Sequence, residues 1–157
     1  MKTINTSWMS VFLLLMLSLS ACAQRERSAL LPAVQAKVLA RQCSRPGPPA
    51  FDDTWQPSRA VIRAMESRLA AIKDLRAENI RYDRNSVADP DKYYMQYVGI
   101  VVDGKRYIYI NAILSAGQDD RWKKRAIVAC DGGSAFWGVL YDVETKTFSD
   151  LAINGGV

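Results

Sequence analysis

The chain has 157 residues, of which 49% are apolar and 24% are charged, and its formal net charge is +5. This length is enough for one domain with a sizeable core but not for two, and the composition is ordinary for a globular protein. The modest positive charge is spread along the chain and argues against nucleic-acid binding, and the absence of histidine excludes His-dependent nucleophiles and the usual catalytic zinc sites.

The N-terminal residues carry a secretion pattern. Lys2 precedes an apolar run at residues 11–17, which is too short to span a bilayer and is typical of a signal peptide. Residues 19–22, Leu-Ser-Ala-Cys, resemble the lipobox of bacterial lipoproteins. The resemblance implies diacylglyceryl transfer to the Cys22 thiol, cleavage before Cys22 and acylation of the new amino group. An ordinary signal peptide cleaved near an unrelated cysteine is the alternative.

The resemblance implies a signal peptide at 1–21, and the residue pattern after it predicts a lipid-anchored tether at 22–54 and a globular α+β domain at 55–157. Removal of the signal, which holds one lysine, leaves 136 residues and a formal net charge of +4. Ala23 rather than Asp follows the modified cysteine, so the resemblance implies a lipid anchor in the outer membrane, facing the periplasm.

Within the tether, residues 33–42 predict a short helix with Val34, Val38 and Leu39 on one face. The proline-rich residues 45–49 that follow predict a semi-rigid spacer.

Two cysteines remain once Cys22 is assigned to lipid, and an even pair in an oxidising compartment predicts a disulfide between Cys43 and Cys130. Such a bond would pin the tether to the domain. A reactive thiol at Cys130, near the basic residues 123–125, is the alternative. Two thiols without Cys-x-x-Cys spacing, in a chain without histidine, predict no metal site, and no cofactor is expected.

Residues 58–78 predict one long amphipathic helix. Ser58 follows a proline and offers an N-cap hydroxyl. Apolar residues then recur at spacings of four, four, three and three. The stripe consists of Val61, Met65, Leu69, Ile72 and Leu75. Charged residues fall largely off it, so we expect a core helix; a membrane-surface or partner helix is the alternative.

Residues 93–102 and 106–114 are rich in Tyr, Val and Ile and predict two strands. The Asp-Gly pair at 103–104 is a strong hairpin signal because both residues tolerate positive φ.

With a two-residue turn, Val101 pairs with Arg106 and Gly99 with Ile108, whereas a glycine bulge would shift this register by one. One face then carries Tyr93, Met95, Tyr97, Val101, Ile108, Ile110, Ala112 and Leu114. The other face carries Tyr94, Gln96, Val98, Ile100, Tyr107, Tyr109 and Asn111.

Three further strands are predicted at 125–130, 135–143 and 148–153. Every link is short enough for antiparallel neighbours, so we expect an α+β fold with one long helix packed on an antiparallel meander sheet of four to five strands. By analogy, this arrangement is similar to cystatin-like and nuclear-transport-factor-like folds.

The sheet half also resembles small secreted bacterial proteins of uncharacterised function. The resemblance rests on Tyr109-Ile110-Asn111-Ala112, Asp131-Gly132-Gly133, Phe136-Trp137 and Asn154-Gly155. It implies a fold and an envelope location, and no activity.

Aromatic side chains of the sheet are the candidate binding residues, because Tyr and Trp anchor interfaces and stack on sugar rings. The expected binding face consists of Tyr94, Tyr107, Tyr109, Trp137 and Tyr141. The alternative is that these side chains are core, covered by the tether and the Cys43 segment.

No clustered carboxylate pair stands out, so we do not expect an enzyme. We expect a lipid-anchored module that binds or inhibits an envelope protein or a cell-wall partner, as immunity proteins do. Its partners would be the membrane, through the lipid, and this envelope component, but not nucleic acid. A structural or assembly component of the envelope and a carboxylate-based hydrolase are the alternatives.

Overall fold

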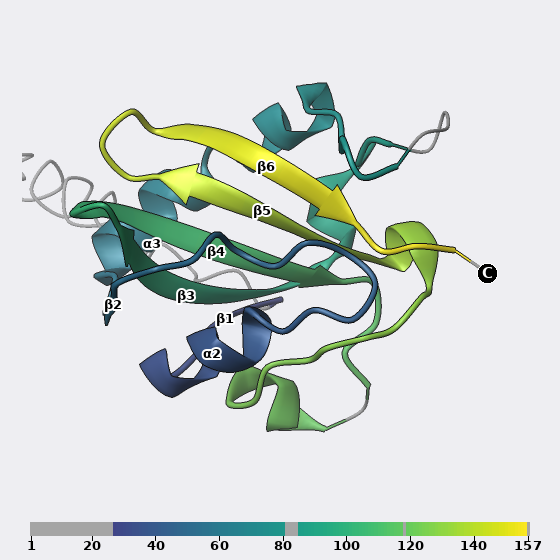
Figure 1. Cartoon of the computed structure of the whole chain (residues 1–157), viewed down its shortest axis with the longest axis horizontal. Coiled ribbons are helices and arrows are strands. Elements are labelled where there is room, and N and C mark those ends of the chain that lie inside the picture. Colours follow the sequence, from purple (N-terminus) through teal and green to yellow (C-terminus); the bar gives the residue numbers. More distant parts are fainter. Residues whose placement is uncertain (1–26, 81–84, 118, 157) are drawn as a thin grey trace, which may run out of the picture.

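The chain builds one six-stranded mixed sheet with short helical segments on both faces (Figure 1). The computed structural model describes residues 27–80, 85–117 and 119–156, so the predicted signal peptide and Cys22 lie outside the described residues. The strands are β1 (Ser28–Leu30), β2 (Asp53–Trp55), β3 (Tyr94–Val102), β4 (Lys105–Ile113), β5 (Phe136–Asp142) and β6 (Thr147–Ile153). β3 to β6 form an antiparallel meander. β1, which is parallel to β3, and β2, which is antiparallel to it, share the outer edge of β3.

The predicted fold class is wrong in two respects. The fold is α+β, but the sheet is mixed rather than an antiparallel meander, and no long helix occurs in the described part of the chain. β1 and β2 have three residues each, which is too short to leave a periodic signal. β1 and the first two residues of β2 lie in the stretch 22–54 that was expected to be a tether. The folded domain therefore includes the described part of that stretch.

The segment expected as one helix over 58–78 contains α3 (Arg59–Glu66) and the 3₁₀ helix η4 (Leu69–Asp74). The predicted N-cap is confirmed, because the Ser58 hydroxyl accepts a hydrogen bond from the Val61 amide at 3.3 Å. The start of the helix was therefore predictable, but its end was not.

The α-helix stops at Ser67, whose hydroxyl donates to the carbonyl of Ala64 at 2.8 Å. Such local side-chain bonds compete with the helical ladder. From Leu69 onward the apolar spacing of three matches the three residues per turn of a 3₁₀ helix. The change of spacing in the sequence thus coincides with the break.

The β3–β4 hairpin has the predicted register, with Val101 opposite Arg106. Its turn residues Asp103 (φ 48°) and Gly104 (φ 75°) both adopt positive φ. A two-residue turn of this kind matches the right-handed twist of the strands, so no bulge shifts the pairing.

Gly99 pairs with Ile108, as predicted, and β2 occupies the space beside Gly99. A Cβ atom on Gly99 would lie 2.3 Å from the carbonyl oxygen of Trp55. Only glycine lets β2 approach this closely.

Two cores lie on opposite faces of the sheet, because alternate residues of each strand point to opposite sides. On the helix face, α3 and η4 cover the strands, and the buried side chains include Ile62, Met65, Leu69, Ile72, Met95, Tyr97, Ile108, Ile110, Trp137, Val139 and Tyr141. On the loop face, η3 (Ala33–Gln35) and α2 (Ala36–Leu39) cover the strands, and the buried set is Leu31, Ala36, Leu39, Val98, Ile100, Tyr109 and Leu140.

The short helix predicted at 33–42 is present in part, but its apolar face is wrong. Leu39 is fully buried, whereas Val34 is 68% exposed and Val38 is 41% exposed. Ala36 and Leu39 face the sheet instead. The initial 3₁₀ turn alters the rotation between residues, so α-helical spacing selects the wrong side chains.

Candidate functional site

The connection between β4 and β5 spans residues 114–135 and is called here the anchored loop. It contains the 3₁₀ helices η6 (Asp120–Lys123) and η7 (Gly133–Ala135). The strand predicted at 125–130 is wrong: β4 pairs directly with β5, so the loop has no place in the ladder. Connections of this length inside a small domain are usually functional.

Side-chain amides from the sheet hold the middle of the anchored loop. The amide nitrogen of Gln96 donates to the carbonyls of Trp122 and Arg125. Its oxygen accepts from the Ile127 backbone amide at 2.9 Å and from the Asn111 side chain at 2.8 Å. Gln96 and Asn111 are 0% and 1% exposed. The side-chain amides therefore make the hydrogen bonds to the loop backbone that a neighbouring strand would make in a regular sheet.

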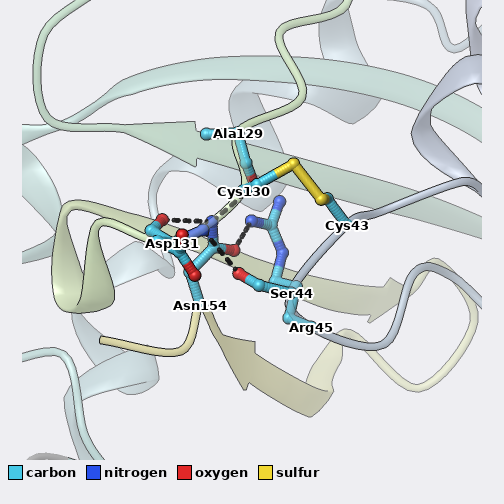
Figure 2. Close-up of a disulfide and its surroundings, with 7 residues drawn as sticks. All are labelled: Cys43, Ser44, Arg45, Ala129, Cys130, Asp131 and Asn154. Atoms are coloured by element: carbon cyan, nitrogen blue, oxygen red, sulfur yellow. Dashed lines mark hydrogen bonds between the residues drawn. A yellow bond between two sulfur atoms is a disulfide. The ribbon is translucent and has the colours of Figure 1, made fainter. Parts of the chain in front are cut away.

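A third amide holds the far part of the loop (Figure 2). The Asn154 side chain donates to the carbonyls of Ala129 and Asp131, each at 2.8 Å. The Asp131 backbone amide in turn donates to the Ser44 hydroxyl at 3.0 Å. Loop, C-terminal segment and Cys43 segment are thus joined at one point.

Arg45 lies at the centre of this network and is 6% exposed. Its guanidinium donates to the side-chain oxygens of Asn154 and Asn111. No ion pair to Arg45 and no partner for its Nε atom are found in the described part of the chain. The buried cation is therefore solvated by amide dipoles alone, an arrangement that tolerates little loss of partners.

The Tyr109 ring packs beside Arg45 on the loop face. Burial raises the pKa of its hydroxyl above the ordinary value of 10.0, and the positive charge of Arg45 opposes this rise. That hydroxyl has no well-aligned hydrogen-bond partner among the described residues, although the Arg45 side chain lies close enough to lower its pKa. It also lies over Gly138, where a Cβ atom would approach within 2.1 Å of the phenolic oxygen.

The predicted disulfide between Cys43 and Cys130 is present and lies next to this network (Figure 2). It joins residues 87 positions apart. On the chain-entropy model, closing a loop of this length stabilises the fold by about 4 to 5 kcal/mol. The bond fastens the anchored loop to the segment that carries Arg45.

The outer side of the anchored loop forms an open hollow of about 310 Å³, lined in part by Asp119, Arg121, Trp122 and Arg125. Arg121 is paired with Asp119 at 2.7 Å, and its hydrogen bonds lower the pKa of that carboxyl below the usual value. The indole of Trp122 meets the Tyr94 ring edge to face at 5.2 Å. The hollow is therefore lined by an ion pair, Asp119 with Arg121, and by the aromatic side chain of Trp122.

A second hollow of about 200 Å³ lies along the outer edge of β6, where Glu78 and Asp150 are among its lining residues. Both carboxylates are exposed to solvent, whereas carboxyl acid–base catalysis requires a tuned, sheltered pair. The nearby Asn79 side chain bonds both backbone groups of Ile153 and so caps this edge. This hollow therefore gives no specific support to a hydrolase.

The five aromatic residues expected to form one binding face are not brought together. Trp137 and Tyr141 are buried on the helix face, whereas Tyr109 is buried on the loop face. Tyr107 is half-buried beside the loop-face core, and half-buried Tyr94 lies against Trp122. None of the five lines the hollow of the anchored loop, although Tyr94 contacts Trp122, which does.

Sequence reasoning missed the residues that hold the loop, namely Arg45, Gln96, Asn111 and Asn154. A signal was present for two of them. Gln96 and Asn111 interrupt otherwise apolar strands on the same predicted face, and a polar side chain within a buried strand indicates a buried partner.

No protein-family model matches this sequence, and comparison with curated proteins and with solved structures finds no match. Within residues 27–80, 85–117 and 119–156, no group of three potential metal-ligating His, Cys, Asp or Glu side chains occurs. No helix in the same ranges is long and apolar enough to cross a membrane.

Proposed function

We propose that this protein is a lipid-anchored module of the bacterial envelope, held in the outer membrane and facing the periplasm, that binds an envelope partner through the anchored loop. Its mode of action is binding or inhibition, as in immunity proteins, rather than catalysis. The lipobox resemblance at residues 19–22 supports the anchor. The Cys43–Cys130 bond uses two of the three cysteines, so Cys22 is the remaining one.

The observation that carries the binding role is the way in which the anchored loop is held. A buried cation and three buried amides are poor contributors to net stability compared with apolar side chains of similar size. Here they fix an irregular loop in one conformation, with a disulfide beside them. A loop fixed in this way loses little conformational entropy on binding, which favours affinity.

Two measurements test the proposal. Intact mass of protein extracted from membranes is expected to show cleavage before residue 22 and addition of lipid to Cys22. A photo-crosslinking amino acid at Arg121, in the hollow, is then expected to form a discrete adduct in the native envelope.

The matched control places the same amino acid at Lys146, in the exposed β5–β6 turn. It is expected to form no discrete adduct. An unmodified Cys22 would disprove the anchor, and equal crosslinking at both positions would disprove the loop as the binding surface. Recovery of bulk peptidoglycan or of a large complex would favour the structural alternative.

A further inference from the structure

We infer that the anchored loop faces the membrane that holds the protein and that its basic residues bind the phosphates of anionic lipid headgroups. This inference rests on the proposed lipid anchor and names the partner of the same loop. It depends on where the chain enters the fold, how much chain separates that point from Cys22, and which charges surround it.

The chain enters the fold at one end of the sheet. Arg27 donates to the Lys92 carbonyl at 3.1 Å, and its guanidinium lies 5.4 Å from the centre of the Tyr94 ring. Because β1 is parallel to β3, Ser28 lies beside Met95, near the start of β3. The same end of the sheet carries the anchored loop, and η6 contacts β1. We call it the loop end.

The hairpin turns after β3 and β5 lie at the opposite end, called here the turn end (Figure 1). The two ends of the sheet therefore carry different connections. The lysines at the turn end can serve as controls for labelling of the lysines at the loop end.

The stretch of chain between Cys22 and the start of the described fold is short. Arg27 follows Cys22 by five residues, which span at most about 18 Å when fully extended. A lipid on Cys22 therefore keeps Arg27 within about 18 Å of the headgroup layer, comparable to two Debye lengths at physiological ionic strength. When the loop end faces the membrane, the turn end, at the opposite end of the sheet, faces away from it.

The loop end has the charge that suits an anionic surface. Segments 89–92 and 119–125, together with Arg27, contain six basic and four acidic side chains. Three ion pairs join Lys92 to Asp89, Arg121 to Asp119, and Lys123 to Asp120. Arg27, Lys124 and Arg125 are exposed and have no carboxylate partner in the described ranges. These three cations are available to lipid phosphate.

Aromatic side chains lie between these cations. Tyr94 and Trp122 stack edge to face, Arg27 covers the Tyr94 ring, and the Lys123 ammonium lies 5.8 Å from the centre of the Trp122 ring. Trp122 is buried and Tyr94 is half-buried, so these rings hold the cations in position at the surface. The pairing of rings and cations fits a headgroup layer better than a neutral sugar polymer.

Lysine acylation of the purified lipidated protein tests the orientation. The protein is placed in vesicles of phosphatidylcholine alone or of phosphatidylcholine with phosphatidylglycerol, and each lysine is followed by peptide mass. Labelling of Lys124 is expected to fall in the anionic vesicles, with Lys92 and Lys123 following it. The turn-end lysines Lys105 and Lys146 are expected to label equally in both.

A charge-matched pair of variants separates this surface from general electrostatics. Lys124→Glu with Arg125→Glu is expected to abolish the protection of Lys92 and Lys123, since each basic residue near an anionic surface changes affinity by about fivefold. Lys105→Glu with Lys146→Glu is expected to leave that protection unchanged.

Each outcome has a separate meaning. An unmodified Cys22 in the starting material overturns the proposed function itself. A lipidated protein whose Lys124 labels equally in both vesicles overturns the inference alone. A photo-adduct from position 121 that consists of an envelope protein rather than lipid also overturns the inference, while the loop remains a binding surface.

Discussion

The two faces of the sheet are filled by different chemistry. The helix face is an apolar core in which α3 and η4 bury a regular stripe against Met95, Tyr97, Ile108 and their neighbours. The loop face is apolar only in part, and the rest of it is a buried network of Arg45 and amide side chains beside a disulfide. The helix face is held by apolar packing, and the loop face adds buried polar groups and a disulfide that position a loop. Variants of the loop face test this division.

Removal of the disulfide is expected to have the largest effect. Cys43→Ala with Cys130→Ala frees a loop closed over 87 residues, so the free energy of unfolding should fall by about 4 to 5 kcal/mol. Chemical denaturation of the variant, compared with the oxidised and the reduced wild type, measures this loss. A fall below about 1 kcal/mol would mean that the bond constrains neither the unfolded chain nor the loop face.

Asn111→Ala is expected to lower the free energy of unfolding by about 3 to 5 kcal/mol, because buried Arg45 then keeps its charge and loses an acceptor. Urea denaturation measures the change.

The matched control is Arg45→Met with Asn111→Leu, which removes the cation together with one of its two amide partners. It should recover much of the loss, since replacing both partners is close to neutral. A double variant less stable than Asn111→Ala would show that the loss does not arise from the buried charge.

Gly138→Ala tests the packing of the loop-face core. A Cβ atom there would lie 2.1 Å from the Tyr109 hydroxyl oxygen, so the tyrosine must move, at a cost of about 1 to 3 kcal/mol. Gly156→Ala is the control, because nothing lies within 4 Å of its added Cβ. Thermal unfolding compares the two variants, and equal stability would place the Tyr109 ring elsewhere.

Tyr109→Phe is expected to have the smallest effect at neutral pH, within about 1 kcal/mol of the wild type, because the lost hydroxyl has no well-aligned hydrogen-bond partner among the described residues. At alkaline pH the difference grows. Burial raises the pKa of Tyr109 in the folded state, so its contribution is fully present below pH 10.0 and is lost as the pH rises through the higher folded pKa. The variant should lose less stability than the wild type above pH 10.0, and an identical alkaline profile would contradict the assignment.

The helix face was largely predictable because its signals are local and regular. The Ser58 cap, the stripe through Met65, Leu69 and Ile72, and the turn at residues 103–104 each follow from neighbouring residues. The break at Ser67 was missed, since a single hydroxyl that bonds its own helix leaves little trace in a hydrophobic pattern. The burial of Trp137 and Tyr141 on this face was missed as well, because both were expected in a binding face.

The loop face was not predictable in the same way. Arg45 meets Asn154 and Asn111 across 109 and 66 residues of sequence, and such contacts leave no local pattern. The hydrophobic residues near Ile127 predict a strand, but the Ile127 backbone amide donates to the side chain of Gln96 rather than to another strand. Only the disulfide, from cysteine number and location, could be predicted in this region. The binding residues were sought among aromatic side chains, most of which proved to be core.

Amide hydrogen exchange within the anchored loop tests the central claim most directly. The backbone amides of Ala126 and Ile127 donate to the side chains of Gln35 and Gln96 at 2.8 and 2.9 Å, although they belong to no strand or helix. We expect both amides to be protected in the wild type and to exchange rapidly in Asn111→Ala, while amides of β4 and β5 stay protected. Rapid exchange of Ala126 and Ile127 in the wild type would contradict the account, because the loop would then not be held by the buried amides.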